Sequence, residues 1–581
     1  MYDYLIENAR IVDGLGGEPY SGNIAIKDGI IAQIGEVSGR ARETIKADGA
    51  FASPGWVDVH THFDGQVSWD DTIDPSFSHG VTSVVMGNCG VGFAPCPPGG
   101  EKGLIQLMEG VEDIPGTALY EGIEWGRWET FPEYIDYLGT KKYTLDVGAQ
   151  IPHSAVRNYV MGDRALRHED ATVSDLTAMC EIVKEGLKSG ALGFSTSRTV
   201  GHRSILGEPI PGTFAEKKEL LAIAGAMQEV GLGVFQAIPA GTVGDIAGPE
   251  KWTTEQEVEV FAEVAKKSGR KCTFTLVQNA NRPDQWRNCL SIVEETNRSG
   301  EFLIPQIATR PIGFVTSLGT YHMFMRRQTY LQLAELPFDK MLAELKKPEI
   351  KAKILADNDV PPDQPGVMAN VYGLMAMAAP NMFPIEMPID YEPEPESSIG
   401  SLAAREKRDV ADYMYDFLTE GSGNQFAILL GANFFDGSFS VMEEMIAHPD
   451  TTIGLSDAGA HVNLIFDAVG PTYQLTHWVR DRKRGRRFAI ESLVRKQTFT
   501  NASLFGLTDR GSLESGKKAD INLFDMESLG LGPLEVHRDL PAGGSRILQG
   551  ATGYLNTFVS GVKTRENDED TGARPGRVIR R

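Results

Sequence analysis

The residues best suited to chemistry begin with two histidines, His60 and His62, which follow the apolar run Trp56-Val-Asp-Val. Side chains at i and i+2 of a strand point to the same face, about 6.5–7 Å apart along it, close enough to share one metal ion. Two histidines at a strand end can also simply form hydrogen bonds. Their position after Pro54-Gly55, on the first of a series of candidate strands, favours a metal site.

A second candidate, Asp457, lies in the segment Gly454-Leu-Ser-Asp-Ala-Gly-Ala-His461 at the end of the last candidate strand. A carboxylate there, opposite the first strand of a closed barrel, could both contact a metal and accept a proton from water. A bound metal would lower the pKa of that water to roughly 7. An aspartate after a strand is also a common helix cap. Combined with the histidine pair, the pattern predicts that Asp457 is catalytic.

A parallel sheet would position these residues, and the sequence predicts one. Apolar β-type runs alternate with amphipathic helical stretches, as in βα units. Eight candidate strands favour an α/β fold of the (β/α)₈ TIM-barrel type, with catalytic groups at the C-terminal strand ends. An open, doubly wound sheet is less favoured because no G-x-G-x-x-G follows any strand. The candidate strands span residues 56–60, 82–87, 145–151, 191–196, 233–237, 272–277, 302–308 and 452–456.

Both ends of the chain carry short β-type runs between Gly and Asp residues, which predicts one small β domain built from residues 1–53 and 509–581 around a barrel at 54–508. Two unrelated edge hairpins are the alternative. About 140 residues separate the seventh and eighth candidate strands, more than one helix needs. This spacing predicts an inserted subdomain at about 315–445, before the last barrel strand. Its Met-rich stretch around Met375 could be a pliable lid or plain core.

Composition and charge restrict the classes of function. The 581 residues are 41% hydrophobic and 23% charged, which is ordinary for a soluble globular enzyme. A formal net charge of −23 would repel phosphate backbones and anionic membrane surfaces, so neither nucleic acid nor membrane is expected as a partner. We see no secretory signal, no C-x-x-C pair among the five cysteines and no apolar stretch of roughly 18 residues, which predicts a cytoplasmic protein.

Several longer segments carry a more specific signal, among them Gly87-Asn-Cys-Gly90. The other segments begin at His79, Pro152, Gly190, Asn501, Gly516 and Gly572. Together with the H-x-H pair, the late aspartate and the two-ended β domain, they resemble the amidohydrolase superfamily. Within it, the chain is similar to the N-acyl-D-amino-acid deacylase (D-aminoacylase) branch over nearly its whole length. The resemblance implies a metal-dependent hydrolase of a non-peptide amide, usually with zinc.

The resemblance also implies roles for individual residues. His60 and His62 would be ligands of a loosely held metal, and Cys89 would be a ligand of a tightly held one. Asp457 would be the general acid/base. His153 falls in a segment shared with the family and is placed among the candidate substrate contacts. A cysteine at a strand end is otherwise usually a small buried hydrophobe.

The chain departs from the family pattern at the second metal. The family places histidines at the ends of the fifth and sixth strands, whereas these strands end here with Gln236 and with Gln278 and Asn279. No histidine occurs between His202 and His322. Amides are poor ligands for zinc. We therefore predict about one zinc ion per chain, on the H-x-H pair and the late aspartate with the cysteine as a fourth ligand, and regard a second ion as doubtful.

The amide side chains could instead hold a polar substrate group, such as an amide carbonyl, or be ordinary polar groups at the barrel rim. Arg198 and His202 follow the fourth strand and Arg310 follows the seventh. An arginine at this face could clamp a substrate carboxylate, although surface arginines are commoner than clamps.

The resemblance, together with the candidate site residues, thus implies hydrolysis of a non-peptide carbon–nitrogen bond in a small molecule, with the amide of an N-acyl amino acid or a related compound as the favoured substrate. Asp457 would take the proton of the attacking water and return it to the leaving amine. The alternatives are a hydrolase of another amide, a cyclic imide or a lactone, and a non-catalytic protein of the same fold. The fold is also compatible with a homo-oligomer.

Overall fold

The structure is a computed structural model that describes residues 1–37, 39–243, 248–362 and 370–580. Within these residues, eight strands form one sheet in the order β16-β12-β11-β10-β9-β8-β7-β6, and every neighbouring pair is parallel. The strands are β6 (Trp56–Asp58), β7 (Val81–Met86), β8 (Asp146–Pro152), β9 (Gly193–Ser197), β10 (Val234–Ile238), β11 (Cys272–Thr275), β12 (Leu303–Ile307) and β16 (Thr452–Ile453).

The two edge strands of this sheet meet and close it into a barrel. Thr61, just after β6, forms a parallel bridge with Ala458, which follows β16. His62 donates its backbone N–H to the Ala458 carbonyl at 2.8 Å. The predicted (β/α)₈ barrel is confirmed, and each predicted strand range overlaps one observed strand. The first and last strands are shorter than predicted because the chain leaves the sheet there and forms loops.

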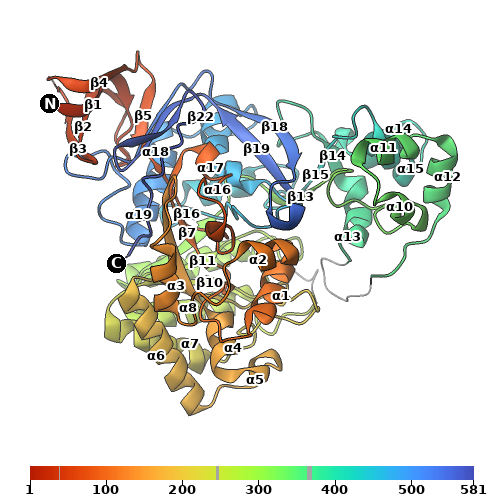
Figure 1. Ribbon diagram of the computed structural model, residues 1–581, viewed down its shortest axis with the longest axis horizontal. Helices are drawn as coiled ribbons and strands as arrows, with labels where there is room; N and C mark the ends of the chain where they lie inside the picture. Colours follow the sequence, from red (N-terminus) through yellow and green to blue (C-terminus); the bar gives the residue numbers. More distant parts are fainter. Residues whose placement is uncertain (38, 244–247, 363–369, 581) are drawn as a thin grey trace.

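The sequence explains the boundaries of these elements. All six residues of β7 are buried, as expected of a parallel strand that is covered on both faces. Thr172 and Asp175 form a reciprocal capping box that begins α6 (Val173–Ser189), and Gly190 ends this helix with a left-handed φ of 116°. Figure 1 shows α6 and α7 (Lys217–Val230) on the outer side of the barrel strands.

The other α-helices outside the inserted lobe lie between successive barrel strands or after the last one. They are α1 (Glu101–Glu112), α2 (Gly116–Gly122), α3 (Phe131–Leu138), α4 (His153–Met161), α5 (Asp163–Leu166), α8 (Thr254–Ser268), α9 (Gln285–Arg298), α16 (Ser440–Ala447), α17 (Gly470–Tyr473), α18 (Ile490–Arg495) and α19 (Asn501–Leu504). Among the described helices, none combines the length and apolarity that crossing a membrane requires.

Both ends of the chain contribute to a second, mixed sheet of nine strands. Its strands are β1 (Tyr2–Ile11), β2 (Tyr20–Lys27), β3 (Ile30–Gly35), β4 (Ala41–Lys46), β5 (Phe51–Pro54), β17 (Ile521–Phe524), β20 (Tyr554–Val559), β21 (Val562–Glu566) and β22 (Glu569–Asp570). The ends are joined where β5 pairs with β17, with Pro54 opposite Ile521. One sheet from both termini is therefore confirmed, whereas the exact domain boundaries stay a prediction. A separate hairpin consists of β18 (Gly530–His537) and β19 (Arg546–Thr552).

The segment between β12 and β16 contains a lobe that projects to the right in Figure 1. Its three-stranded sheet and its helices are β13 (Ile312–Thr316), β14 (Met382–Pro384), β15 (Ala427–Ala432), α10 (Gln328–Leu333), α11 (Phe338–Leu345), α12 (Pro348–Ala356), α13 (Val371–Ala378), α14 (Ile399–Arg405) and α15 (Val410–Thr419). The lobe has its own apolar core, in which Met375 and Met382 are buried, whereas Met377 is 70% exposed. The Met-rich stretch thus supplies core residues and some exposed apolar surface.

The end of the barrel where the strands begin is closed by the C-terminal part of the chain. Ile579 packs with Val57, Val85 and Val234 from three barrel strands. Beside this contact, the Asp146 carboxylate at the start of β8 accepts hydrogen bonds from Arg510 Nη1 at 2.6 Å and from the backbone N–H of Arg577 at 2.9 Å. Lys518 Nζ lies 2.9 Å from the same carboxylate.

Candidate metal centre

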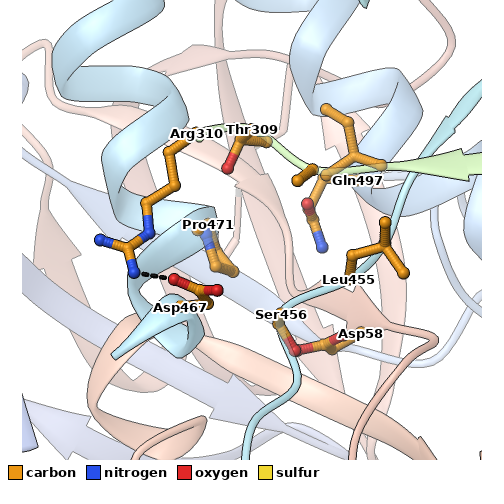
Figure 2. A pocket seen from close by; sticks show the side chains of 12 residues that line it. Asp58, Thr309, Arg310, Leu455, Ser456, Asp467, Pro471 and Gln497 are labelled. Atoms are coloured by element: carbon orange, nitrogen blue, oxygen red, sulfur yellow. Dashed lines mark ion pairs between the residues drawn. The ribbon is translucent and has the colours of Figure 1, made fainter. Parts of the chain in front are cut away.

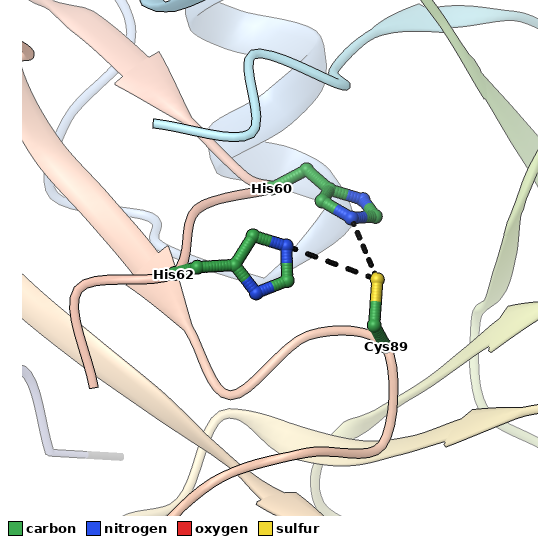
Figure 3. Close-up of side chains that lie close together, drawn as sticks. All are labelled: His60, His62 and Cys89. Carbon is green, nitrogen blue, oxygen red and sulfur yellow. Dashed lines mark hydrogen bonds between the residues drawn. The ribbon is translucent and has the colours of Figure 1, made fainter. Parts of the chain in front are cut away.

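Three buried side chains converge at the C-terminal ends of β6 and β7. Cys89 Sγ lies 3.3 Å from His60 Nε2 and 3.8 Å from His62 Nε2, and Figure 3 shows both imidazoles turned toward the sulfur. All three potential ligand atoms lie within 4.8 Å of one another. The exposed fraction is 1% for each histidine and 6% for the cysteine. A donor set of this kind can hold a metal ion.

Asp457 approaches the same point from β16. Its Oδ1 lies 3.3 Å from His60 Nε2 and 3.6 Å from His62 Nε2. Ligands around a tetrahedral zinc with Zn–N bonds of 2.0–2.1 Å are about 3.3 Å apart. The spacing of imidazole nitrogen, carboxylate oxygen and thiol sulfur therefore fits one zinc-sized ion. Because the Asp457 side chain is 21% exposed, solvent reaches the site from this side.

The backbone at the site adopts conformations that most residues avoid. Cys89 has a φ of 56° and Asp457 a φ of 45°, both in the left-handed region that costs free energy for residues other than glycine. Gly90, at φ 72°, packs so closely on β9 that an added Cβ would lie 3.0 Å from Thr196 Cα. These conformations direct the thiol and the carboxylate to the same point as the histidines.

The two histidines are held from behind by different groups. His60 Nδ1 lies 2.7 Å from Oε1 of Gln306 on β12, so that Nδ1 carries the proton and Nε2 offers its lone pair to the site. His62 Nδ1 faces Glu112 Oε1, the last residue of α1, at 3.2 Å. The other Glu112 oxygen lies 3.7 Å from His461 Nε2. Both imidazoles thus direct Nε2 toward the cysteine and the aspartate.

The electrostatics of the site are dominated by burial and by carboxylates. Burial, together with Glu112, Asp457 and Asp64, raises the pKa of the Cys89 thiol well above its ordinary value. Burial and the carboxylates of Asp457 and Asp64 likewise raise the pKa of Glu112. Burial would raise the pKa of Asp457, but a hydrogen bond from His62 and the charges of His60, His62 and His461 hold it well below the ordinary range. A bound cation would favour the thiolate at Cys89.

The predicted polar residues on the fifth and sixth strands lie at different distances from this centre. Gln236 on β10 is buried, and its Oε1 accepts the backbone N–H of Cys89 at 3.3 Å. Gln278, after β11, donates its backbone N–H to Asn433 Oδ1 of the inserted lobe at 2.7 Å. Asn279 forms hydrogen bonds to the Gly241 carbonyl and the Arg282 N–H through its side chain. Gln236 therefore borders the metal centre, and Gln278 lies between the barrel and the lobe.

His153 and Arg198 are each held by a buried carboxylate. His153 uses both ring nitrogens within the protein, with Thr196 Oγ1 and Glu219 Oε1 each at 2.8 Å. Arg198 donates Nε to Glu257 at 3.0 Å and Nη1 to the Gly212 carbonyl at 3.0 Å. These side chains connect barrel strands to the surrounding helices.

Arg310 forms a buried ion pair with Asp467, drawn in Figure 2. Its guanidinium stacks on the Phe466 ring at 3.9 Å. The cavity beside it has a volume of about 10 Å³ and is bordered by Asp58 and Ser456. This volume is sufficient for one water molecule and not for a substrate.

His202 lies within electrostatic range of the metal centre. Burial, together with the charges of His461 and His62, lowers the pKa of His202 to about 3. Its Nδ1 is buried without a hydrogen-bond partner in the described structure. Of the predicted substrate contacts, His202 and Gln236 are thus brought near the centre.

Sequence reasoning missed several residues that surround the centre, among them Gln306, His461 and Glu112. Gln306 was detectable as a polar residue within the otherwise apolar seventh strand. His461 stands in the Asp457 motif, but the motif alone does not distinguish it as a neighbour of the metal centre. Glu112 gave no signal, because it is one of several acidic residues along Glu109-Gly-Val-Glu-Asp113.

Comparison with known proteins agrees with this architecture. A model described as the amidohydrolase family matches residues 43–562. The D-aminoacylase of Alcaligenes xylosoxydans xylosoxydans is 24% identical over 589 aligned positions that cover 100% of this chain and 98% of that protein. An N-acyl-D-aspartate deacylase of the same organism is 25% identical and covers 99% of this chain and 95% of its own length.

Solved structures show the same fold. A crystal structure of D-aminoacylase superposes with a TM-score of 0.65 at 21% identity, with both chains covered completely. The N-acyl-D-glutamate deacylase of Bordetella bronchiseptica, complexed with zinc and a phosphonate inhibitor, gives a TM-score of 0.64 at 22% identity with the same coverage. The chain therefore belongs to the amidohydrolase family, as a metal-dependent hydrolase of non-peptide carbon–nitrogen bonds that is D-aminoacylase-like along its whole length.

Proposed function

We propose that this enzyme hydrolyses the amide bond of an N-acyl amino acid or a closely related small molecule, using one zinc ion held by His60, His62, Cys89 and Asp457. The observation that supports it best is the spacing of 3.3–3.8 Å between the imidazole nitrogens and the cysteine and aspartate ligand atoms. The relatives that match over the whole chain are deacylases of N-acyl-D-amino acids by name.

When bound, such an ion supplies a Lewis acid that polarises the amide carbonyl and makes water acidic enough to react at neutral pH. Asp457 accepts the proton of the attacking water at its carboxylate and returns it to the departing amine nitrogen. Its partial exposure lets it reach both groups, and the neighbouring imidazoles keep its carboxylate ionised at neutral pH.

The remaining groups orient the site or contact the substrate. Gln306 and Glu112 fix the rotation of His60 and His62. Gln236 and His202, each with a buried unpartnered nitrogen, are the best placed of the predicted substrate contacts. His153, Arg198 and Arg310 remain predicted contacts, although their protein partners favour a role in holding the barrel wall.

We propose about one ion per chain rather than two. A D-aminoacylase of known structure has a binuclear metal centre, with one-metal activation and second-metal attenuation. Where the family carries the histidines of its second metal, this chain has Gln236 and Gln278, which offer weak amide ligands. The five free cysteines fit a reducing, cytoplasmic compartment.

Elemental analysis of protein purified without added metal tests the metal assignment. We expect about one zinc per chain, lost to a chelator together with amidase activity and restored by zinc. Cys89→Ala should reduce zinc retention, whereas Cys96→Ala, which changes another buried cysteine, should not. Two tightly held ions, or full activity in chelator, would contradict the proposal.

A panel of N-acyl-D- and L-amino acids, cyclic imides and lactones tests the reaction class. Turnover of imides or lactones alone would contradict the proposed hydrolysis of N-acyl amino acids.

A further inference from the structure

The two arginines predicted as carboxylate clamps are each paired with a buried carboxylate of the protein. Arg198 follows β9 and shares two hydrogen bonds with Glu257, at 3.0 and 3.4 Å. Arg310 follows β12, and its Nη2 is paired with Asp467, with both side chains 5% exposed. Its Nε and Nη1 have no hydrogen-bond partner in the described structure, but they border a cavity of only about 10 Å³. A buried guanidinium that already holds a buried carboxylate does not release it for a ligand without leaving that carboxylate unpaired, which is costly.

Negative groups surround the centre itself. Glu112 is 1% exposed, Asp64 is 4% exposed, and Asp457 adds a third carboxylate. Glu112 Oε1 lies 3.2 Å from His62 Nδ1, and Asp457 Oδ1 lies 3.3 Å from His60 Nε2. Asp64 accepts the backbone N–H of Gly87, two residues before Cys89, at 3.1 Å. A substrate carboxylate placed next to the scissile bond would be repelled by these three carboxylates. A single divalent ion must already offset their charge.

Neutral amide groups with unused hydrogen-bonding capacity line the same end of the barrel. Gln236 Nε2 and Asn433 Nδ2 are unpartnered donors, and Gln278 Oε1 is an unpartnered acceptor. Their residues are at least nine-tenths buried, with exposed fractions of 0%, 1% and 2%. Buried polar groups are normally paired, so three unpaired amides at one end of a barrel point to a ligand that pairs with them. The contact between Gln278 N–H and Asn433 Oδ1 links two of them.

We propose that the substrate presents a neutral polar group, such as an amide, to Gln236, Gln278 and Asn433, rather than a free carboxylate to an arginine. The substrate class is then an N-acyl compound whose carboxyl group is amidated or otherwise uncharged. This inference rests on the proposed amide hydrolysis and narrows it. A neutral amide offers both an acceptor and donors, and therefore matches the two free donors and the free acceptor.

A matched pair of substrates tests the charge preference. N-acetylleucine and N-acetylleucinamide, each as D and L enantiomers, are compared by release of acetate from zinc-loaded enzyme. We expect kcat/KM to be about 100-fold higher for the amide, since buried polar groups left unpaired discriminate strongly between ligands. An equal or higher value for the acid would overturn the proposal.

Binding separates this inference from the proposed function. If neither compound releases acetate, hydrolysis of N-acyl amino acid derivatives fails, and calorimetry on the zinc-loaded enzyme still measures the affinity for each compound. Tighter binding of the neutral compound supports the inference. Equal or tighter binding of the acid, or binding of neither, overturns it.

Substitution of one amide gives a second test. Gln278→Lys places a free cation among these groups and should reduce the preference for the neutral substrate at least about tenfold by adding a partner for a carboxylate. Asn288→Lys adds the same charge on the outside of α9 and should leave the preference unchanged. Zinc content and the melting temperature show that each variant is folded.

Gln278→Leu, which keeps the size of the side chain, should lower kcat/KM for the amide only. An unchanged ratio of the two kcat/KM values in folded Gln278→Lys and Gln278→Leu would overturn the assignment.

Discussion

Where the barrel strands begin, Asp146 pairs with Arg510 at 2.6 Å and with Lys518 at 2.9 Å, and Lys518 lies 2.6 Å from Asp520. Where the strands end, Gln236, Gln278 and Asn433 carry buried polar atoms without partners. The first end joins the barrel to the β sheet and to the C-terminal part of the chain. The second holds four potential metal ligands and the three amide side chains that we propose contact the substrate.

The difference separates groups that stabilise the fold from groups that act on a ligand. A fully paired buried network contributes to holding segments together, and breaking it leaves charges without partners. Unpaired buried amides reduce stability in the free protein and are retained where a ligand supplies the missing partner. The comparison therefore predicts that changes at the two ends affect different measurements.

The largest effect is expected on kcat, from a substitution at the end of the barrel that holds the candidate metal centre. Asp457→Asn keeps the size of the side chain but removes the proton acceptor, so kcat should fall at least about 100-fold with the melting temperature nearly unchanged. Asp436→Asn, an exposed aspartate of the preceding segment, serves as the control and should retain activity. Near wild-type turnover in Asp457→Asn would contradict both its assignment and the comparison.

At the end of the barrel where the strands begin, a substitution should instead lower the free energy of unfolding. Asp146→Asn leaves Arg510 and Lys518 without their shared carboxylate, and we expect a loss of about 3 kcal/mol in the free energy of unfolding. Urea unfolding measures this loss, and kcat of the folded fraction should stay within about twofold of wild type. Asp136→Asn, which breaks the exposed pair with Arg580, should cost no more than about 0.5 kcal/mol. Similar losses in both variants would argue against a special role of the buried network.

Lowering the pH should weaken the ion pairs of Asp146 and thereby reduce the stability that they contribute. Burial would raise the pKa of Asp146, but the charges of Lys518 and Arg510 hold it below the ordinary value. A carboxyl whose pKa is lowered by folding contributes stability that is complete above its unfolded pKa of about 3.9 and is lost as the pH falls through the folded pKa. The difference in unfolding free energy between wild type and Asp146→Asn should therefore shrink below about pH 4. A difference that stays constant from pH 6 to pH 3 would show that the carboxylate charge contributes little.

The smallest effect concerns the link between the inserted lobe and α1. Tyr321 donates its hydroxyl hydrogen to Asp113, next to Glu112, at 2.6 Å. Tyr321→Phe should cost about 1 kcal/mol in unfolding free energy, the contribution of one hydrogen bond. Zinc content should stay at the wild-type value, because Glu112 keeps its contact with His62. Loss of zinc in this variant would show that the lobe itself maintains the metal centre.

Local sequence patterns predicted the barrel strands and the H-x-H pair because both depend on residues near one another in the chain. Apolar β-branched runs identify parallel strands, and i, i+2 spacing identifies a shared face. The partners of these residues could not be predicted in this way. Gln306 lies 246 residues from His60 in the sequence, and Glu257 lies 59 residues from Arg198. Whether an arginine is a free clamp or a neutralised one depends on such distant contacts.

The sheet built from both termini also has a consequence for the order of folding. Trp56, at the start of the first barrel strand, donates its indole N–H to Tyr554, 498 residues later in the chain. During synthesis, β5 can therefore pair with β17 only after almost the whole chain has been made. Contacts between distant segments form late and slow folding, and open strand edges favour aggregation meanwhile. Slow production at low temperature, or a chaperone that covers the N-terminal strands, should therefore increase the yield of folded enzyme.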